Sequence, residues 1–191
     1  MSLIPAFEIG ICNAWLFILG LVLINYGLAS LTAKETTLFI WPKYNEKEKR
    51  LLSITMVTHF GSWIYSIFLP LKLGTAWFYT GLVIYLVGMI FLTVAVLNFV
   101  TTPAGKPVTK GAFRLSRHPM YVGWFLIYIG IGIACSSWIF LVIAMMFMIL
   151  QMHILVIPEE RMCLERFGEV YREYMNKTPK WIGIPKSGRS D

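Results

Sequence analysis

Residues 76–100 read AWFYTGLVIYLVGMIFLTVAVLNFV, a run that contains no charged side chain. An uncharged apolar run of about 18 residues or more is typical of a helix that crosses a bilayer. The composition of the whole chain agrees, because 57% of its 191 residues are hydrophobic and only 14% are charged. In soluble domains about 45–50% of the residues are apolar and about 25% are charged. The sequence therefore predicts an all-α integral membrane protein.

Apolar stretches on both sides of this run extend the prediction to about five membrane helices. They lie at 9–31, 51–71, 76–100, 121–135 and 139–157. The fourth would be only about 22 Å long as a helix, against a bilayer core of roughly 30 Å. The last two helices are therefore predicted to form a short hairpin, 121–157, which either barely crosses the bilayer or re-enters it.

Basic residues predict the orientation of these helices. Three polar segments, 32–50, 101–120 and 158–191, hold every Lys and Arg except Lys72. With five crossings the three segments share one side of the membrane. The positive-inside rule then places the N-terminus outside and the C-terminus in the cytoplasm. Cytoplasmic loops facing anionic headgroups also account for the net charge of +7, so no nucleic-acid partner is predicted.

The polar end of the chain carries a different periodicity. Phe167, Tyr171 and Tyr174 recur at steps of three and four, with charged residues between them. This pattern predicts a cytoplasmic amphipathic helix over 158–178. The chain then divides into three N-terminal membrane helices in 1–100, with a basic cytoplasmic loop at 32–50, and a second subdomain in 101–191.

Glycines and cysteines have simpler interpretations. Gly81 and Gly88, like Gly123 and Gly130, are seven residues apart, so each pair lies on one helix face and allows close backbone approach. No internal repeat is inferred from them. The three cysteines are odd in number and widely spaced, so neither a disulfide framework nor a metal site is predicted.

The densest basic cluster stands directly before the fourth apolar stretch, in RLSRHPMYVG (114–123). Arginines and a tyrosine at a membrane boundary are typical of an anchor, which would explain Arg114, Arg117 and Tyr121. An anchor does not require His118 followed by Pro119, a ring that donates and accepts hydrogen bonds beside a residue that fixes the backbone. The cluster alone leaves an anchor and a functional site open.

Glu159 and Glu160 follow Pro158 at the start of the predicted C-terminal helix. Carboxylates in a first helical turn gain roughly 0.3–1 kcal/mol from the helix dipole, which is sufficient reason for their presence. Both clusters nevertheless flank the same hairpin on the same predicted side. Together they would border one pocket suited to a charged molecule that meets an apolar one. His59 and His153 lie inside predicted membrane helices and are interpreted as neutral residues hydrogen-bonded between helices.

The two clusters also carry a resemblance. GAFRLSRHPMYVG (111–123), an apolar hairpin and PEERMCLERFGEVYREYMNKTP (158–179) resemble the isoprenylcysteine carboxyl methyltransferase family. That family shows RHP-x-Y-x-G before a helical hairpin and EE-x-x-L-x-x-x-FG-x-x-Y-x-x-Y after it. The resemblance covers 98–179, and the earlier helices are similar only in being membrane helices.

The resemblance implies an integral membrane methyltransferase that uses S-adenosylmethionine and releases S-adenosylhomocysteine. The second subdomain, 101–191, would then be catalytic, with a cofactor loop, the hairpin 121–157 and the helix 158–178. Arg117, Glu159 and Glu160 are the implied catalytic residues. The implied cofactor-binding residues are Asn98, Lys106, Pro107, Val108, Phe113, His118, Pro119, Met120, Tyr121 and Glu159.

The implied substrate is the carboxylate of a prenylated cysteine or a similar lipophilic group, met at the cytoplasmic side. One departure bears on this substrate: Leu155 stands where better-known eukaryotic relatives carry an arginine suited to a substrate carboxylate. Methylation of a lipid amine such as phosphatidylethanolamine therefore remains an alternative. A non-enzymatic membrane subunit is a second one. The expected partners are a lipophilic substrate from the bilayer and membrane lipids.

Overall fold

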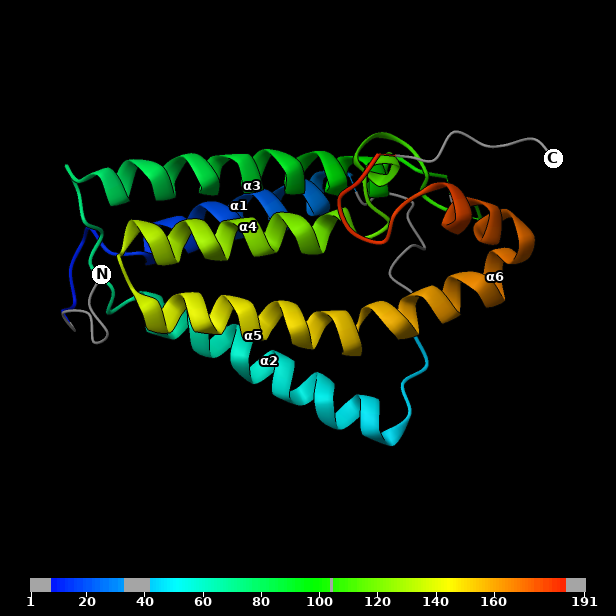
Figure 1. Cartoon of the computed structure of the whole chain (residues 1–191), viewed down its shortest axis with the longest axis horizontal. Coiled ribbons are helices and arrows are strands. Elements are labelled where there is room, and N and C mark those ends of the chain that lie inside the picture. The colour runs from blue at the N-terminus through cyan, green and yellow to red at the C-terminus, as the bar shows by residue number, and fades with distance from the viewer. Residues whose placement is uncertain (1–7, 33–41, 104, 185–191) are drawn as a thin grey trace.

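The computed structural model describes residues 8–32, 42–103 and 105–184. Within these ranges the chain is helical and contains no strand, which confirms the predicted all-α class (Figure 1). The elements are α1 (Trp15–Thr32), α2 (Glu46–Ser66), α3 (Ala76–Val100), the 3₁₀ turn η1 (Gly111–Arg114), α4 (Pro119–Ala134), α5 (Trp138–Ile154) and α6 (Val156–Lys177).

Two helices among the described residues are long and apolar enough to cross a membrane. They are α3 and the continuous helix Trp138–Lys177, whose apolar part is α5. α1 and α4 are apolar over shorter lengths. Large apolar side chains are exposed along α3, as at Val83 and Ile90, and along α5, as at Val142. Exposed apolar faces of this extent suit a lipid environment better than water.

The helix bounds follow the predicted apolar stretches closely, with informative exceptions. α3 spans the predicted 76–100, and α4 begins two residues before the predicted 121. α2 begins five residues before the predicted 51, because Asn45 and Glu48 form a capping box. The Asn45 side chain accepts from the Glu48 backbone N–H at 2.8 Å, and Glu48 accepts from the Asn45 N–H at 2.8 Å. These reciprocal bonds begin a helix within a charged segment.

Among the described helices, α3 and α4 make the most extensive contact, and this contact depends on the paired glycines. A Cβ placed on Gly81 would lie 2.5 Å from the Gly130 carbonyl oxygen, and one on Gly130 would lie 2.6 Å from the Tyr85 backbone nitrogen. A Cβ on Gly123 would lie 2.8 Å from Leu92. The two backbones therefore touch, and a larger residue at these positions would push the helices apart.

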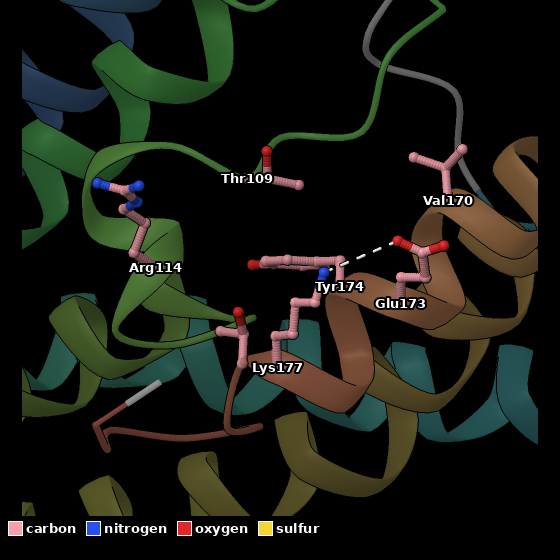
Figure 2. A pocket seen from close by; sticks show the side chains of 7 residues that line it. Thr109, Arg114, Val170, Glu173, Tyr174 and Lys177 are labelled. Atoms are coloured by element: carbon pink, nitrogen blue, oxygen red, sulfur yellow. Dashed lines mark ion pairs between the residues drawn. The ribbon is translucent and has the colours of Figure 1, made fainter. Parts of the chain in front are cut away.

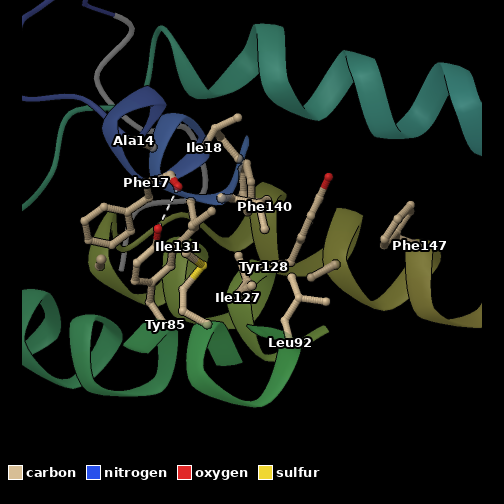
Figure 3. Packing of buried hydrophobic residues seen from close by; sticks show 14 of the residues in the cluster. Ala14, Phe17, Ile18, Tyr85, Leu92, Ile127, Tyr128, Ile131, Phe140 and Phe147 are labelled. Carbon is tan, nitrogen blue, oxygen red and sulfur yellow. Dashed lines mark hydrogen bonds between the residues drawn. The ribbon is translucent and has the colours of Figure 1, made fainter. Parts of the chain in front are cut away.

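Aromatic and aliphatic side chains fill the space between these helices and their neighbours (Figure 3). Tyr85 from α3 stacks on Phe17 of α1 with ring centroids 4.3 Å apart and donates a 2.8 Å hydrogen bond to the Phe17 carbonyl. Tyr128 of α4 is fully buried, and its hydroxyl lies 2.8 Å from Ser62 Oγ and 3.1 Å from His59 Nδ1 on α2. The predicted interhelical hydrogen bond of His59 is thus confirmed, whereas the side chain of His153 lies outside the described residues.

The described parts of the polar segments gather at one end of the helices (Figure 1). The start of α2, the end of α3, the start of α4 and the end of α5 all lie there, whereas Lys72 lies at the opposite end, where its backbone N–H bonds the Ala134 carbonyl. α6 continues from α5 and then bends sharply at Gly168 (φ +53°, ψ −126°), so that its second half turns back toward the loop before α4. The predicted 158–178 helix is therefore two segments joined by a kink, which only glycine adopts easily.

Candidate active site

The loop between α3 and α4 forms the first wall of the site. Asn98 on α3 accepts a 2.9 Å hydrogen bond from the Ala112 backbone N–H through its Oδ1. Gly111 has a φ of +57°, and a Cβ there would lie 1.9 Å from the same oxygen. On the other side, the Tyr174 hydroxyl donates a 2.6 Å bond to the Phe113 carbonyl. Helix α3 and the second half of α6 therefore fix η1 from both sides.

His118 occupies the start of α4, where Pro119 is the first helical residue. Proline suits this position because its missing N–H would have no helical partner there. The His118 backbone N–H instead donates to the buried Ser116 Oγ at 3.0 Å. The imidazole is 6% exposed, stacks on Tyr121 at 5.9 Å between centroids, and lies 6.1 Å from the ring of Trp181. The ring is therefore held in one orientation.

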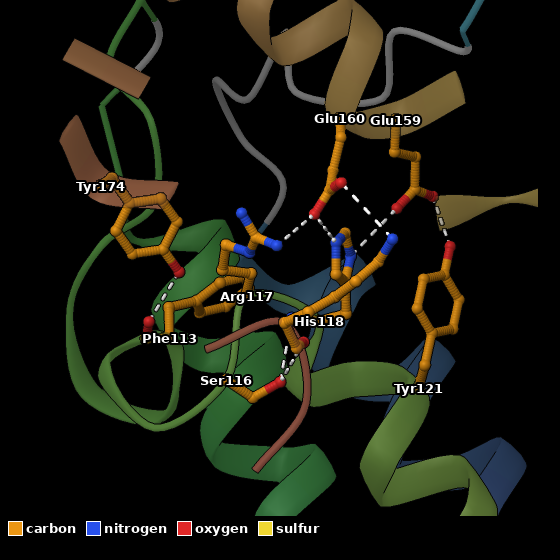
Figure 4. A network of polar contacts seen from close by, with 9 residues as sticks. Phe113, Ser116, Arg117, His118, Tyr121, Glu159, Glu160 and Tyr174 are labelled. Atoms are coloured by element: carbon orange, nitrogen blue, oxygen red, sulfur yellow. Dashed lines mark hydrogen bonds and ion pairs between the residues drawn. The ribbon is translucent and has the colours of Figure 1, made fainter. Parts of the chain in front are cut away.

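Glu160, from the first turns of α6, meets this histidine directly (Figure 4). Its Oε1 lies 3.0 Å from His118 Nε2 and 3.2 Å from Arg117 Nη2, and its Oε2 lies 3.6 Å from Lys180 Nζ. Desolvation alone would raise the pKa of Glu160. The His118 hydrogen bond and the nearby cations outweigh it and hold the pKa below its usual range. Glu160 is thus a stable anion that aligns three nitrogen donors.

Glu159 has a different environment from its neighbour. Its Oε1 accepts a hydrogen bond from the Tyr121 hydroxyl, and its Oε2 lies 3.7 Å from His118 Nδ1. Burial raises the pKa of Glu159 to about 7, and the charge of Glu160 adds to this rise, while the Tyr121 hydrogen bond opposes it. Two adjacent carboxyls therefore have pKa values moved in opposite directions, an arrangement found where acid and base roles are divided.

The state of His118 follows from the same contacts. Burial lowers its pKa by more than the hydrogen bond with Glu160 raises it. A neutral imidazole whose Nε2 faces an ionised carboxylate carries its proton on Nε2. We therefore assign the Nε2–H tautomer, which leaves Nδ1 as an acceptor beside Glu159.

The structure brings together five of the residues predicted for the site: Arg117, His118, Tyr121, Glu159 and Glu160. Three others, Phe113, Met120 and Val108, pack with Tyr171 and Tyr174 in a hydrophobic cluster beneath the loop. Pro119 is buried at the helix start. Lys106 is exposed and Pro107 is half-buried in the loop. Among the described residues, neither has a hydrogen bond or ion pair with Glu159 or Glu160, which we call the acid pair. Asn98 holds η1 and does not reach the acid pair by any described hydrogen bond.

Sequence reasoning did not identify several members of this network. Lys180 and Trp181 follow the end of α6, and the kink at Gly168 brings them back to the start of α4. Arg117 donates its backbone N–H to the Pro179 carbonyl at 3.0 Å. Ser116 is fully buried and donates from its hydroxyl to the Lys180 carbonyl at 3.2 Å. No local signal in the sequence predicts these contacts, because they depend on a reversal of the chain.

Leu155 is 8% exposed at the junction of α5 and α6, where its carbonyl accepts from the Glu159 backbone N–H at 3.1 Å. A shallow surface pocket lies between the loop and the second half of α6 (Figure 2). It is lined by Thr109, Arg114, Val170, Glu173, Tyr174, Lys177 and Thr178. Neither residue of the acid pair lines this pocket. We therefore place the candidate active site at the acid pair and treat the pocket as part of the outer surface of the loop.

Residues 69–170 match the family model described as phospholipid methyltransferase. The match contains α3, the loop, α4, α5 and α6 as far as Val170, and so includes both His118 and the acid pair. More than half of the chain is covered, and the protein belongs to the phospholipid methyltransferase family. This family is one of the integral membrane methyltransferases, the group that the sequence motifs predicted. A comparison with curated proteins gave no match.

Proposed function

We propose that this protein transfers a methyl group from S-adenosylmethionine to a lipophilic acceptor at the cytoplasmic side of a membrane. The observation that carries the proposal is the convergence of the His118 region with the Glu159–Glu160 pair at one end of the apolar helices. A methyltransferase family implies this cofactor as the methyl donor. The site lies where a polar cofactor from water and an apolar substrate from lipid can both arrive.

The residues present fit this cofactor. Arg117 Nε is a buried N–H group without a hydrogen-bond partner among the described residues, and it suits the carboxylate of the methionine moiety. The Glu159 oxygen that Tyr121 engages has a second lone pair, and it suits a hydrogen bond from a sugar hydroxyl of the cofactor. We propose that His118, Tyr121 and Glu159 hold the cofactor together with the cofactor loop, and that Glu160 orients Arg117 and His118.

When bound, S-adenosylmethionine supplies an electrophilic methyl group. The protein residues position the partners and exclude water, because a displacement of this kind depends mainly on alignment. The hydrophobic cluster under the loop closes the side next to α6. With a pKa of about 7, Glu159 can also take a proton through Oε2 from the ammonium group of a lipid amine, which frees the nitrogen lone pair.

The acceptor that these features favour is a lipid amine. The family description names phospholipids, and the Leu155 position provides no guanidinium for a substrate carboxylate. A carboxylate acceptor would also need no base, whereas an ammonium group needs one. The carboxylate of a prenylated cysteine is the second candidate, because the RHPMY and PEE motifs resemble those of isoprenylcysteine carboxyl methyltransferases.

We further propose the membrane arrangement that places this site. Five crossings, with the N-terminus outside and the C-terminus in the cytoplasm, would put the basic segments 101–120 and 158–191 on the cytoplasmic side. Residues 1–100 then form three supporting membrane helices, and 101–191 form the catalytic subdomain. The gathering of the described parts of these segments at one end of the helices supports this arrangement.

The test is methyl transfer by the purified protein from labelled S-adenosylmethionine, with phosphatidylethanolamine and a prenylated cysteine supplied in separate reactions. We expect label in the lipid headgroup, in a bond that resists mild base. Label released by mild base from the prenylated cysteine would indicate a methyl ester and support the second candidate. Absence of transfer to either, together with no thermal stabilisation by S-adenosylhomocysteine, would overturn the proposed function.

A further inference from the structure

The segment directly before α2 lies against α6, although about 115 residues separate the two in the chain. Arg161, which follows Glu160, donates from Nη1 to Glu48 Oε1 at 3.2 Å and from Nη2 to Glu48 Oε2 at 3.1 Å. The same Nη2 donates to the Lys43 carbonyl at 2.9 Å. We refer to these three bonds as the Arg161 clamp.

The geometry of the clamp is specific. A guanidinium that meets both oxygens of one carboxylate fixes direction as well as distance. The carboxylate is itself held, because Glu48 is part of the capping box that begins α2. Arg161 is 44% exposed, so the ion pair adds little to global stability. Its main consequence is to set the position of the residues between Lys43 and Glu48 relative to α6.

Tyr44 is one of the residues that the clamp positions. Its hydroxyl oxygen is buried and has no hydrogen-bond partner among the described residues. Burial raises the pKa of Tyr44 to about 12, and the carboxylates of Glu159 and Glu48 also contribute to the rise. Tyr44 directly follows Lys43, whose carbonyl is bonded by Arg161, and Arg161 is two residues after Glu159, so Tyr44 lies beside the turn of α6 that carries the acid pair. A buried hydroxyl without a partner is costly, and a bound ligand that accepts its hydrogen bond would remove this cost.

We propose that Tyr44 is a further cofactor-binding residue, whose hydroxyl donates a hydrogen bond to an oxygen of the bound S-adenosylmethionine or S-adenosylhomocysteine beside Glu159. This inference rests on the proposed function. Arg161 is a positioning residue that acts through Tyr44. Tyr44 precedes α2 and Arg161 is in α6, so the two are distant in the chain. Tyr44 also lies outside the segment 69–170 that the family model covers. The cofactor site would thus include a residue from the N-terminal half of the chain.

The test is calorimetric titration of the full chain with S-adenosylhomocysteine. Loss of one neutral hydrogen bond raises a dissociation constant about threefold to tenfold. We expect this increase for Tyr44→Phe, with no change in thermal stability without ligand. Tyr79→Phe is the matched control, because Tyr79 is exposed in the first turn of α3, whereas the candidate site adjoins the last turn of that helix. We expect that control to bind as the wild type does.

Arg161→Gln tests the clamp without altering Tyr44. We expect a weaker affinity similar to that of Tyr44→Phe, and we expect the double variant to bind no more weakly than the weaker single one, because the two changes remove one contact. Additive losses would overturn the positioning role of Arg161. If the wild type binds S-adenosylhomocysteine and Tyr44→Phe binds equally well, the inference about Tyr44 is wrong. If the wild type does not bind it, the proposed function itself fails.

Discussion

His118 and Glu160 are 42 residues apart in the chain, yet Nε2 of one lies 3.0 Å from Oε1 of the other. The hairpin of α4 and α5 separates them in sequence, and its return brings them together. One partner begins α4 and the other lies in the first turns of α6. This contact is one of several that join the two motifs carrying the family resemblance.

This contact predicts strong coupling between the two residues. We expect His118→Ala and Glu160→Ala each to weaken S-adenosylhomocysteine binding about tenfold or more, since each leaves the other residue without its partner. In the double variant the losses should not add. Calorimetry measures the affinities, and circular dichroism verifies that the variants remain helical. Glu46→Gln, on an exposed part of α2, is the control. Additive losses would show that the two side chains act separately.

The raised pKa of Glu159 predicts a pH dependence of stability. A glutamate has an ordinary pKa of 4.5, and in the folded protein that of Glu159 is about 7. The folded state therefore holds this proton more tightly than the unfolded state does. The resulting contribution of Glu159 to the free energy of unfolding is fully present below pH 4.5 and is lost as the pH rises through 7. Glu159→Gln mimics the protonated form and does not titrate. We therefore expect the melting temperature of the variant minus that of the wild type to be larger at pH 8 than at pH 5.

Thermal melts of the ligand-free proteins at both pH values measure this difference. Glu165→Gln, an exposed change on the same helix, serves as the reference for a general effect of charge removal. A constant difference between Glu159→Gln and the wild type across this range would contradict the prediction.

The contact between α3 and α4 predicts a large effect from a single methyl group. Gly130→Ala would place Cβ 2.6 Å from the Tyr85 nitrogen and 2.8 Å from the Gly81 carbonyl oxygen. Overpacking of this kind costs about 1–3 kcal/mol. Gly61→Ala on α2 is the matched control, because its Cβ would meet no atom within 4 Å. Denaturation in detergent measures both, and equal stability of the two variants would refute the close approach.

The hydrogen bond from Tyr174 to Phe113 predicts a connection between α6 and the loop. Tyr174→Phe removes a 2.6 Å bond at a residue that is 8% exposed and leaves the Phe113 carbonyl without this donor. We expect a loss of about 1 kcal/mol in stability. We also expect faster hydrogen exchange at the 3₁₀ turn η1, measured by mass spectrometry. Unchanged exchange there would mean that Asn98 alone holds the turn.

Sequence patterns were sufficient to predict the helical class and the bounds of α3, because an uncharged run of this length has few other structures available. They were also sufficient to predict that the His118 cluster and the acid pair meet, since both flank one hairpin. The early start of α2 was missed because the capping box lies within charged residues that a hydropathy pattern does not register.

The features that the sequence did not predict, in the fold and in the site, depend on tertiary contacts. α1 begins at Trp15 and not at the predicted 9. Just before it, the Asn13 side chain donates to the Ile67 carbonyl at 2.7 Å, and the Asn13 backbone forms an isolated antiparallel bridge with Pro70. Tyr44 lies beside the start of α6 because Arg161 joins α6 to the segment before α2. No spacing of residue types along the chain predicts such contacts, since each depends on where another helix ends.

The reversal at Gly168 makes the last described residues part of the candidate active site. Leu115 accepts a 3.0 Å hydrogen bond from the Gly183 backbone N–H, and Lys180 reaches Glu160 from the same returning strip. A chain shortened at Lys177 would keep every described helix and would still lose the contacts of Lys180 with Glu160 and of Gly183 with Leu115. Truncation there should therefore produce a well-folded membrane protein with an open, inactive site, and a tag fused near that end is best preceded by a long spacer.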